Sequence, residues 1–379
     1  MTVTETKLKK TARQGNFELL RIIAMIMIVT LHYLGKGKLL NLDNGSNTYF
    51  VAWFCEALSY VAVNVYVLIS GYFIKSTKFR FNKILDLWIQ TIIISGTAYI
   101  IALKTGISEE FKSADFFKSF MPITRNSYWF ITTYFVFCAI APFLVNIVNT
   151  INQKQHKTVC ATLVFITSVL PTIFFEADWL KISKGYHIIW FVTLFFVASY
   201  IRKYDTFKKS PFFYFVLYLA SCTIGYVIKF VLCYLTLRLN NTDKSDKFFA
   251  NYNMFFVFLA SVFLFLAFKN IKINSNILNK IILFFSSTTL YVYLIHEAPS
   301  TRSFLWEKIV NPMGHLGFPD IIINYIVGIF GVYFACTVLG YIIKTVYSLL
   351  QLPKLTLLIS NVLSKLTNKI MESKLISKH

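Results

Sequence analysis

The chain has few charged residues for its length. Only 15% of its 379 positions are Asp, Glu, Lys or Arg, whereas about a quarter of a soluble domain is charged. Apolar residues make up 56% of the chain, with 39 Phe and 22 Tyr among the aromatics. Most of the chain therefore needs no surface that faces water. These proportions argue against a soluble protein and predict a polytopic membrane protein.

Acidic residues are the scarcer kind of charge, with 17 Asp and Glu against 38 Lys and Arg, and the formal net charge is +21. Many basic proteins bind nucleic acid, but here the bases are scattered through short loops and form no single patch. We therefore predict no nucleic-acid partner. The six cysteines include no CxxC pair and lie within apolar stretches, which predicts neither a disulfide framework nor a metal site.

The sequence also lacks internal repeats, low-complexity linkers and any segment long enough for a folded domain outside the membrane. Its apolar segments have instead the length that crosses about 30 Å of hydrocarbon. These segments recur ten times, at residues 17–34, 51–74, 84–103, 128–149, 157–175, 186–201, 212–237, 250–268, 279–296 and 321–346. The predicted fold is an all-α polytopic membrane bundle of about ten transmembrane helices.

The two ends of the chain are basic. A tail at residues 1–16 precedes the predicted membrane domain (17–346), and a second tail at residues 347–379 follows it. The second tail mixes Leu, Ile and Lys, which fits either an interfacial amphipathic helix or a solvated segment.

The distribution of charge predicts the orientation of the bundle. If the N-terminal tail is cytoplasmic, the segments on its side carry most of the bases and only three acidic residues, Glu5, Asp205 and Glu372. The alternate loops carry most of the acidic residues. This asymmetry is that of the positive-inside rule, so both termini are predicted to face the cytoplasm.

The first apolar segment contains an arginine and a histidine. Arg21 and His32 have ten residues between them, so on one helix they lie about 16 Å apart along the axis. Ionisable side chains at membrane depth are costly and are hypotheses of function by default. The predicted topology puts Arg21 near the cytoplasmic face and His32 near the external face. That arrangement suits an enzyme whose two substrates arrive from opposite sides.

In the outer layer, near the external face, His32 is predicted to act as a general base. A neutral imidazole can take a proton from a hydroxyl while a carboxylate orients the ring and stabilises the imidazolium. Glu56 is the first candidate for this carboxylate and Glu297 is the second. Candidates for the acceptor site are His296, Glu297, Trp129 and Lys229. A histidine satisfied by a backbone carbonyl and an interfacial aromatic belt remain the alternative interpretations of these residues.

The residues of the inner layer, near the cytoplasmic face, predict a site that binds an anion. Arg21, Arg80, Lys83 and Ser70 share this layer, and guanidinium groups bind phosphate oxygens in bidentate fashion. Arg80 and Lys83 are equally explained as ordinary cytoplasmic loop charges. Arg21 has an alternative too, because Glu18 three residues earlier can neutralise it.

Several motifs together resemble one family. ELLRIIAMIMIVTLH at 18–32, VYVLISGYFI at 65–74, YWFITTYFVFCAIAPFL at 128–144 and STTLYVYLIHE at 287–297 resemble the acyltransferase-3 family of integral-membrane O-acyltransferases. Arg21 and His32 match the family's Arg-x10-His motif position for position, whereas Arg80 and Lys83 match its arginine-containing stretch only loosely. Glu56 matches no family motif.

The resemblance implies an O-acyltransferase in a bacterial plasma membrane. Such an enzyme takes an acetyl or other short acyl group from cytoplasmic acyl-coenzyme A, here expected to be acetyl-CoA. It transfers the group to a hydroxyl of a cell-surface polysaccharide or of a lipid-linked precursor such as an undecaprenyl-linked sugar. The expected partners are thus membrane lipid, the acyl donor and the glycan. A transporter or flippase for lipid-linked oligosaccharide, or a polymerase subunit, is the alternative; the sugar, the acyl chain and the oligomeric state stay open.

Overall fold

The structure is a computed structural model and describes residues 13–42, 46–108, 110–174, 183–240 and 251–376. Every regular element within these ranges is a helix. The predicted N-terminal basic tail lies outside the described residues as far as residue 12. The helices are α1 (Gly15–Lys36), η1 (Leu39–Asn41), α2 (Asn47–Ser59), α3 (Ala62–Phe73), α4 (Phe81–Lys104), α5 (Ser113–Phe120), α6 (Trp129–Thr150), α7 (Gln153–Val164), η2 (Phe165–Val169), α8 (Leu170–Ile173), η3 (Ser183–Gly185), α9 (Ile188–Tyr204), α10 (Pro211–Asn240), α12 (Phe255–Lys269), α13 (Asn276–Ser286), α14 (Thr289–His296), α15 (Arg302–Phe304), η4 (Leu305–Val310), η5 (Pro312–Gly314), α16 (Asp320–Leu349) and α17 (Leu352–Ile376).

The predicted helical membrane bundle is confirmed. Each of the ten predicted segments coincides with helix, and eight helical stretches within the described residues are long and apolar enough to cross a membrane. The other two are α9, with 17 residues, and α12, with 15. They rise only about 25 and 22 Å, less than the roughly 30 Å hydrocarbon core. Because α9 packs on α3, α6 and α7, and α12 on α10, α3 and α1, neighbouring helices cover much of their surface in place of lipid.

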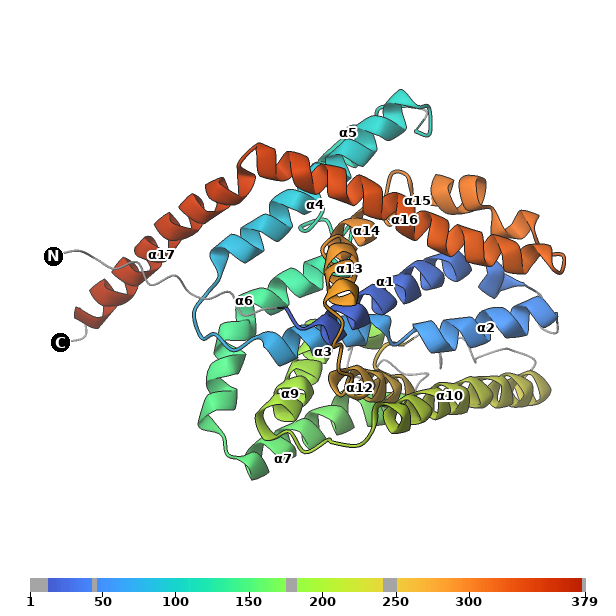
Figure 1. Cartoon of the computed structure of the whole chain (residues 1–379), viewed down its shortest axis with the longest axis horizontal. Helices are drawn as coiled ribbons and strands as arrows, with labels where there is room; N and C mark the ends of the chain where they lie inside the picture. Colours follow the sequence, from blue (N-terminus) through green and yellow to red (C-terminus); the bar gives the residue numbers. More distant parts are fainter. Residues whose placement is uncertain (1–12, 43–45, 109, 175–182, 241–250, 377–379) are drawn as a thin grey trace.

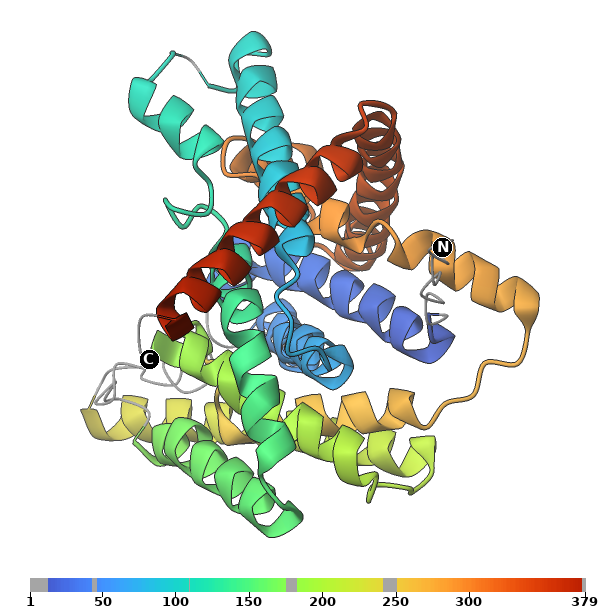
Figure 2. The same cartoon turned by 90° about the vertical axis from the view of Figure 1, so that its left-hand side faces the viewer.

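Helix α1 lies in the middle of the bundle (Figures 1 and 2). It contacts α2, α3, α12, α13, α14 and α16. Leu20, Ala24, Val29 and Tyr33 on this helix are completely buried. The polar side chains of α1 are therefore enclosed by other helices, and the helix joins the two layers that the sequence predicts for donor and acceptor.

The two longest connecting segments contain short helices. Residues 104–127, predicted as a loop, include α5, and residues 297–320 include α15, η4 and η5. In the second segment Trp306 is completely buried. This connection therefore contributes side chains to the interior of the bundle, which matters for the site described below.

The C-terminal tail begins as a helix docked on the bundle. Helix α17 packs along α4 and contacts the end of α16. Its Thr356 is completely buried and donates a hydrogen bond of 2.7 Å to Asp86 Oδ1 on α4. Tyr347 donates to the same oxygen at 3.0 Å. The tail is thus helical from Leu352, while its placement at a lipid interface stays a prediction.

Gly71 allows α3 and α9 to pack closely. A Cβ at Gly71 would lie 3.0 Å from Phe195 Cα and 3.1 Å from Ala198 Cβ. The backbone of α9 cannot move aside as a flexible side chain can, so overpacking should cost about 1–3 kcal/mol. We expect Gly71→Val to lower the melting temperature of the purified protein by a few degrees.

Gly331 on α16 is the matched control, because a Cβ there would have nothing within 4 Å. Gly331→Val should melt close to the wild-type temperature. Equal melting temperatures for the two variants would show that the α3–α9 contact does not depend on the absence of a side chain at position 71.

Candidate active site

Two histidines from distant parts of the chain meet inside the bundle. His32 lies near the end of α1, and His296 is the last residue of α14. His32 Nδ1 is 2.8 Å from His296 Nε2, and His296 Nδ1 is 2.5 Å from the carbonyl oxygen of Val292. His296 is completely buried, whereas the His32 side chain is 21% exposed. His32 is therefore the member of the pair that a substrate can reach.

These contacts fix the tautomers of the neutral rings. A carbonyl oxygen only accepts, so His296 Nδ1 must carry the hydrogen and donate it to Val292. His296 Nε2 then has a lone pair, and His32 Nδ1 donates to it. The remaining His32 nitrogen, Nε2, is left with its lone pair available. No hydrogen bond from the described residues occupies it.

A carboxylate lies beside this pair. Glu297 Oε2 is 3.5 Å from His32 Nδ1, and Glu297 Oε1 is 2.6 Å from Arg302 Nη1. If His32 Nε2 gained a proton, the positive charge of the imidazolium would face Glu297. Arg302 holds the carboxylate in place through a charge-assisted hydrogen bond. The structure thus places the second carboxylate candidate, Glu297, next to His32.

Glu56 and Lys229 lie away from the histidine pair. Glu56 is buried and forms no ion pair with His32 within the described part of the chain; it lies within electrostatic range of Tyr60, Tyr186 and Tyr252 instead. Lys229 is completely buried on α10, where its Nζ lies 3.8 Å from the centroid of the Trp53 ring. Cation–π contact of this kind joins α10 to α2. Roles for Glu56 in orienting His32 and for Lys229 in binding acceptor stay predictions without a contact to the pair.

The four residues predicted to bind the donor line one pocket. Its volume is about 310 Å³, and Arg21, Ser70, Arg80 and Lys83 all contribute to its wall. Lys75 and Lys78 add further positive charge, and the pocket's lining contains no carboxylate: the lining residues are Arg21, Ser70, Phe73, Ile74, Lys75, Ser76, Lys78, Arg80, Lys83, Ile84, Tyr134, Cys138, Ala141 and Pro142. Such a wall fits an anionic group such as a phosphate.

Arg21 is also paired within α1. Its Nη1 forms a close ion pair with Glu18 Oε1, and Glu18 is almost completely buried. The alternative in which Glu18 neutralises Arg21 is thus consistent with the geometry. Another guanidinium nitrogen of Arg21 can still donate to a phosphate. Arg21 can therefore pair with Glu18 and line the basic pocket at the same time.

Neighbouring aromatic rings run from the basic pocket to the histidine pair. Ser70 Oγ is 3.0 Å from the Tyr134 hydroxyl at the edge of the pocket. The Tyr134 ring stacks on Phe130 at 5.7 Å between centroids, Phe130 lies 6.0 Å from Tyr293, and Tyr293 lies 6.5 Å from the His32 ring. A series of neighbouring rings therefore connects the edge of the basic pocket with the histidine pair.

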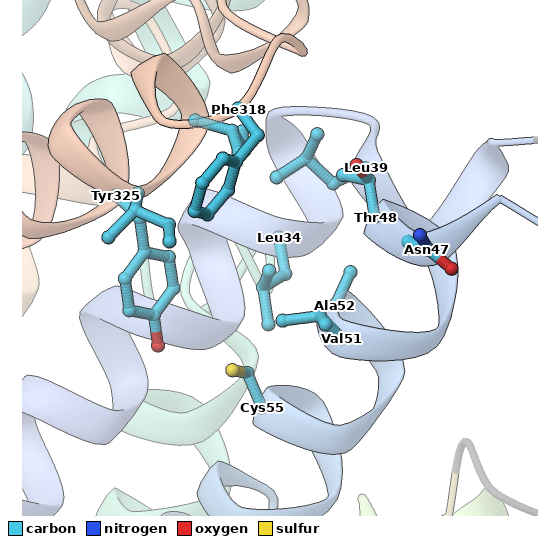
Figure 3. A pocket seen from close by; sticks show the side chains of 11 residues that line it. Leu34, Leu39, Asn47, Thr48, Val51, Ala52, Cys55, Phe318 and Tyr325 are labelled. Carbon is cyan, nitrogen blue, oxygen red and sulfur yellow. The ribbon is translucent and has the colours of Figure 1, made fainter.

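A second pocket, of about 360 Å³, lies between α1, α2 and α16 (Figure 3). Its wall is mostly hydrocarbon, and Leu34, Val51 and Phe318 contribute to it. Tyr325 and Cys55 lie at one end, and Asn47 and Thr48 at the other. Leu34 follows His32 by two residues on α1, so the two side chains leave opposite sides of the helix. The pocket is suited to an apolar chain rather than to a phosphate.

A comparison with known families agrees with the motifs. The family model for the acyltransferase domain named acyltransferase-3 matches residues 14–345. The chain belongs to the acyltransferase-3 family. It is therefore a multi-pass membrane acyltransferase, and the match includes both histidines and the whole basic pocket. No curated protein and no solved structure matches the chain.

Sequence reasoning alone missed three residues of this acyltransferase-3 site. Arg302 and Trp306 lie in a segment predicted as an external loop, yet Arg302 pairs with Glu297 and the Trp306 ring lies 6.1 Å from that of His296. Tyr293 lies within the motif at 287–297, which gives it no role of its own. A basic residue five positions after Glu297 was the one local signal for Arg302. Within the described residues, no three His, Cys, Asp or Glu side chains gather as a metal site.

Proposed function

We propose that this acyltransferase moves an acetyl or other short acyl group from acyl-CoA to a sugar hydroxyl, with His32 Nε2 as the base. One observation carries the proposal: the contacts of His296 leave that nitrogen with a free lone pair, on the same helix whose Arg21 lines the basic pocket. Donor and base are thereby assigned to opposite ends of α1.

The donor's phosphates would bind in the basic pocket. Arg21, Arg80 and Lys83 supply the charge, and Ser70 supplies a hydroxyl. The pantetheine arm would then extend along the rings of Tyr134, Phe130 and Tyr293 toward His32. This direction agrees with the predicted topology, in which the Arg21 end faces the cytoplasm.

The chemical step is a direct acyl transfer. His32 Nε2 takes the proton of the acceptor hydroxyl while that oxygen attacks the thioester carbonyl. The carbon–sulfur bond breaks, and the imidazolium returns the proton to the departing thiolate. Glu297 stabilises the imidazolium in between. A transient acyl-imidazole at the same nitrogen is the alternative route, and label retained on the protein after acid quenching would identify it.

The acceptor in this proposal is a lipid-linked sugar, such as an undecaprenyl-linked intermediate, or a cell-surface polysaccharide at the outer face of a bacterial plasma membrane. The apolar pocket lined by Leu34 supports the lipid-linked form, because it would hold hydrocarbon at about the depth of His32 on α1. Mass analysis of surface glycans from cells with and without the protein identifies the acyl group and the sugar.

The decisive test of activity uses the purified protein in lipid nanodiscs with radiolabelled acetyl-CoA and a lipid extract from the producing cells. We expect label to move into the glycolipid fraction. A flippase or polymerase subunit needs no acyl donor, so the absence of any transfer, with the protein folded, would overturn the proposal.

Glu297→Gln should lower the transfer rate by about tenfold or more. The amide keeps the size of the side chain but loses the charge that stabilises the imidazolium, and each tenfold corresponds to about 1.4 kcal/mol. Initial rates at saturating donor measure this effect. Glu307→Gln is the control, since Glu307 pairs with Lys38 at the surface of the same segment; equal rates for the two variants would refute the role of Glu297.

A further inference from the structure

Four aromatic residues gather around one buried carboxylate on the His32 side of the bundle. Tyr60, Trp129, Tyr186 and Tyr252 form this cluster, called here the aromatic box. Centroid distances are 4.5 Å for Tyr60–Tyr252, 5.5 Å for Trp129–Tyr252, 4.3 Å for Trp129–Tyr186 and 5.1 Å for Tyr186–Tyr252. Tyr60 and Tyr252 are buried, whereas Trp129 and Tyr186 are half-buried. Trp129 and Tyr186 are therefore the more accessible members of the box.

The polar groups of the aromatic box lie close to one another. The Tyr186 hydroxyl lies within hydrogen-bonding reach of those of Tyr60 and Tyr252. Glu56 lies within electrostatic range of all three tyrosines. Glu56 is only 7% exposed, and its Oε2 has no hydrogen-bond partner among the described residues. A buried carboxylate oxygen without a partner is costly and calls for an explanation.

The chain is shaped to bring Tyr186 to this place. Gly185 has a φ of +86°, a backbone conformation that favours glycine because it has no Cβ. A Cβ there would lie 2.8 Å from Asn253 N and 2.9 Å from Tyr252 Cβ. Tyr252 N also donates to Lys184 O at 3.0 Å. The segment before α9 is thus fixed against the segment before α12, and the box is a built feature of the fold.

The box adjoins the histidine pair. Tyr293 lies within electrostatic range of Tyr186 and Tyr252, and its ring is 6.5 Å from that of His32. Trp129 is also next to Phe130, whose ring lies 6.0 Å from Tyr293. A ligand at Trp129 and Tyr186, the two half-buried rings of the box, would therefore lie near Tyr293, the ring beside His32.

We infer that the aromatic box is the subsite for the acceptor's pyranose ring, with Glu56 as its hydroxyl acceptor. The inference rests on the proposed function and names the part of the site that holds the sugar. An indole and a phenol offer flat apolar faces to the C–H side of a sugar, and hydroxyls and a carboxylate bind its O–H groups. A sugar hydroxyl would supply the partner that Glu56 Oε2 lacks. Glu56 is thus a substrate-binding residue and not the orienter of His32.

Saturation-transfer NMR on the full chain in nanodiscs tests this inference. The probes are the methyl glycosides of glucose, galactose, mannose and N-acetylglucosamine. We expect at least one to bind the wild-type protein, Trp129→Ala to raise its Kd by roughly two- to tenfold, and Glu56→Gln to raise it by about tenfold. Trp129→Phe keeps a flat ring and should retain most of the binding.

Two controls separate this inference from the proposed function. Trp88→Ala removes an indole that is 41% exposed on α4 and should bind the sugars normally. His32→Ala should lose transfer but keep sugar binding. If none of the four sugars binds, or if Trp129→Ala and Glu56→Gln bind as the wild type does, the box is not the sugar subsite, even where acyl transfer occurs. Sugar binding at the box without any acyl transfer would instead contradict the proposed function alone.

Discussion

His32→Ala should reduce acyl transfer by about 10²- to 10⁴-fold, the usual contribution of a positioned general base. The side chain is the exposed member of the histidine pair, and its Nε2 is the nitrogen that the hydrogen bond to His296 leaves free. Alanine removes this base without adding bulk to the bundle. The measurement is the initial rate of label transfer from acetyl-CoA by purified protein at saturating donor.

Two further variants make the result specific. His315→Ala removes a partly exposed histidine that pairs with Asp320 outside the site and should leave the rate unchanged. His296→Ala removes the acceptor for His32 Nδ1, so we expect a smaller loss than for His32→Ala because Nε2 is still present. A His32→Ala protein that melts normally and transfers at the wild-type rate would exclude His32 as the base.

Arg21→Gln should raise the Kd for coenzyme A by about 10- to 100-fold, since a hydrogen bond between charged groups contributes about 1.5–3 kcal/mol. Arg21 lines the basic pocket together with Arg80 and Lys83. Glutamine keeps a polar side chain there but loses the charge and the bidentate geometry. Titration calorimetry with coenzyme A measures the change, and Arg125→Gln, at an exposed position beyond α5, is the control.

A double variant distinguishes phosphate binding from ion pairing. Because Arg21 pairs closely with the buried Glu18, Arg21→Gln leaves this carboxylate with only the longer ion pair to Arg13, at 3.7 Å. Glu18→Gln combined with Arg21→Gln removes that cost. We expect the double variant to regain stability but to keep the weak coenzyme A binding. Recovery of the wild-type Kd would mean that Arg21 serves only to neutralise Glu18.

Much of the fold follows from the sequence because membrane helices need long apolar segments. Helix is found in all ten predicted segments, since a helix satisfies its own backbone hydrogen bonds within lipid. The length of α12 was overestimated, because the predicted segment 250–268 begins five residues before the helix, whereas the predicted segment 186–201 is one residue shorter than α9. Apolar side chains such as Tyr252 and Met254 precede α12, and nothing local shows where the helix begins.

The sequence predicts the depth of each site residue in the membrane, but not the direction in which its side chain points from the helix. Topology assigns Glu56 and Glu297 to one layer with His32, but which of them faces the imidazole depends on how α2 and α14 are rotated and packed. The structure places Glu297 there through the end of α14. Arg302 is brought in by the fold of the segment after α14, which has no periodic pattern. The basic pocket was easier, because Arg80 and Lys83 follow Ser70 closely along the chain.

The central claim is that one helix connects a donor pocket at one membrane face with a base at the other. Sealed membrane vesicles from producing cells, prepared in both orientations, test it directly with radiolabelled acetyl-CoA added only outside. We expect labelled glycan when the face bearing Arg21 is outward, and none when the face bearing His32 is outward. Label that appears only in the second case would contradict it.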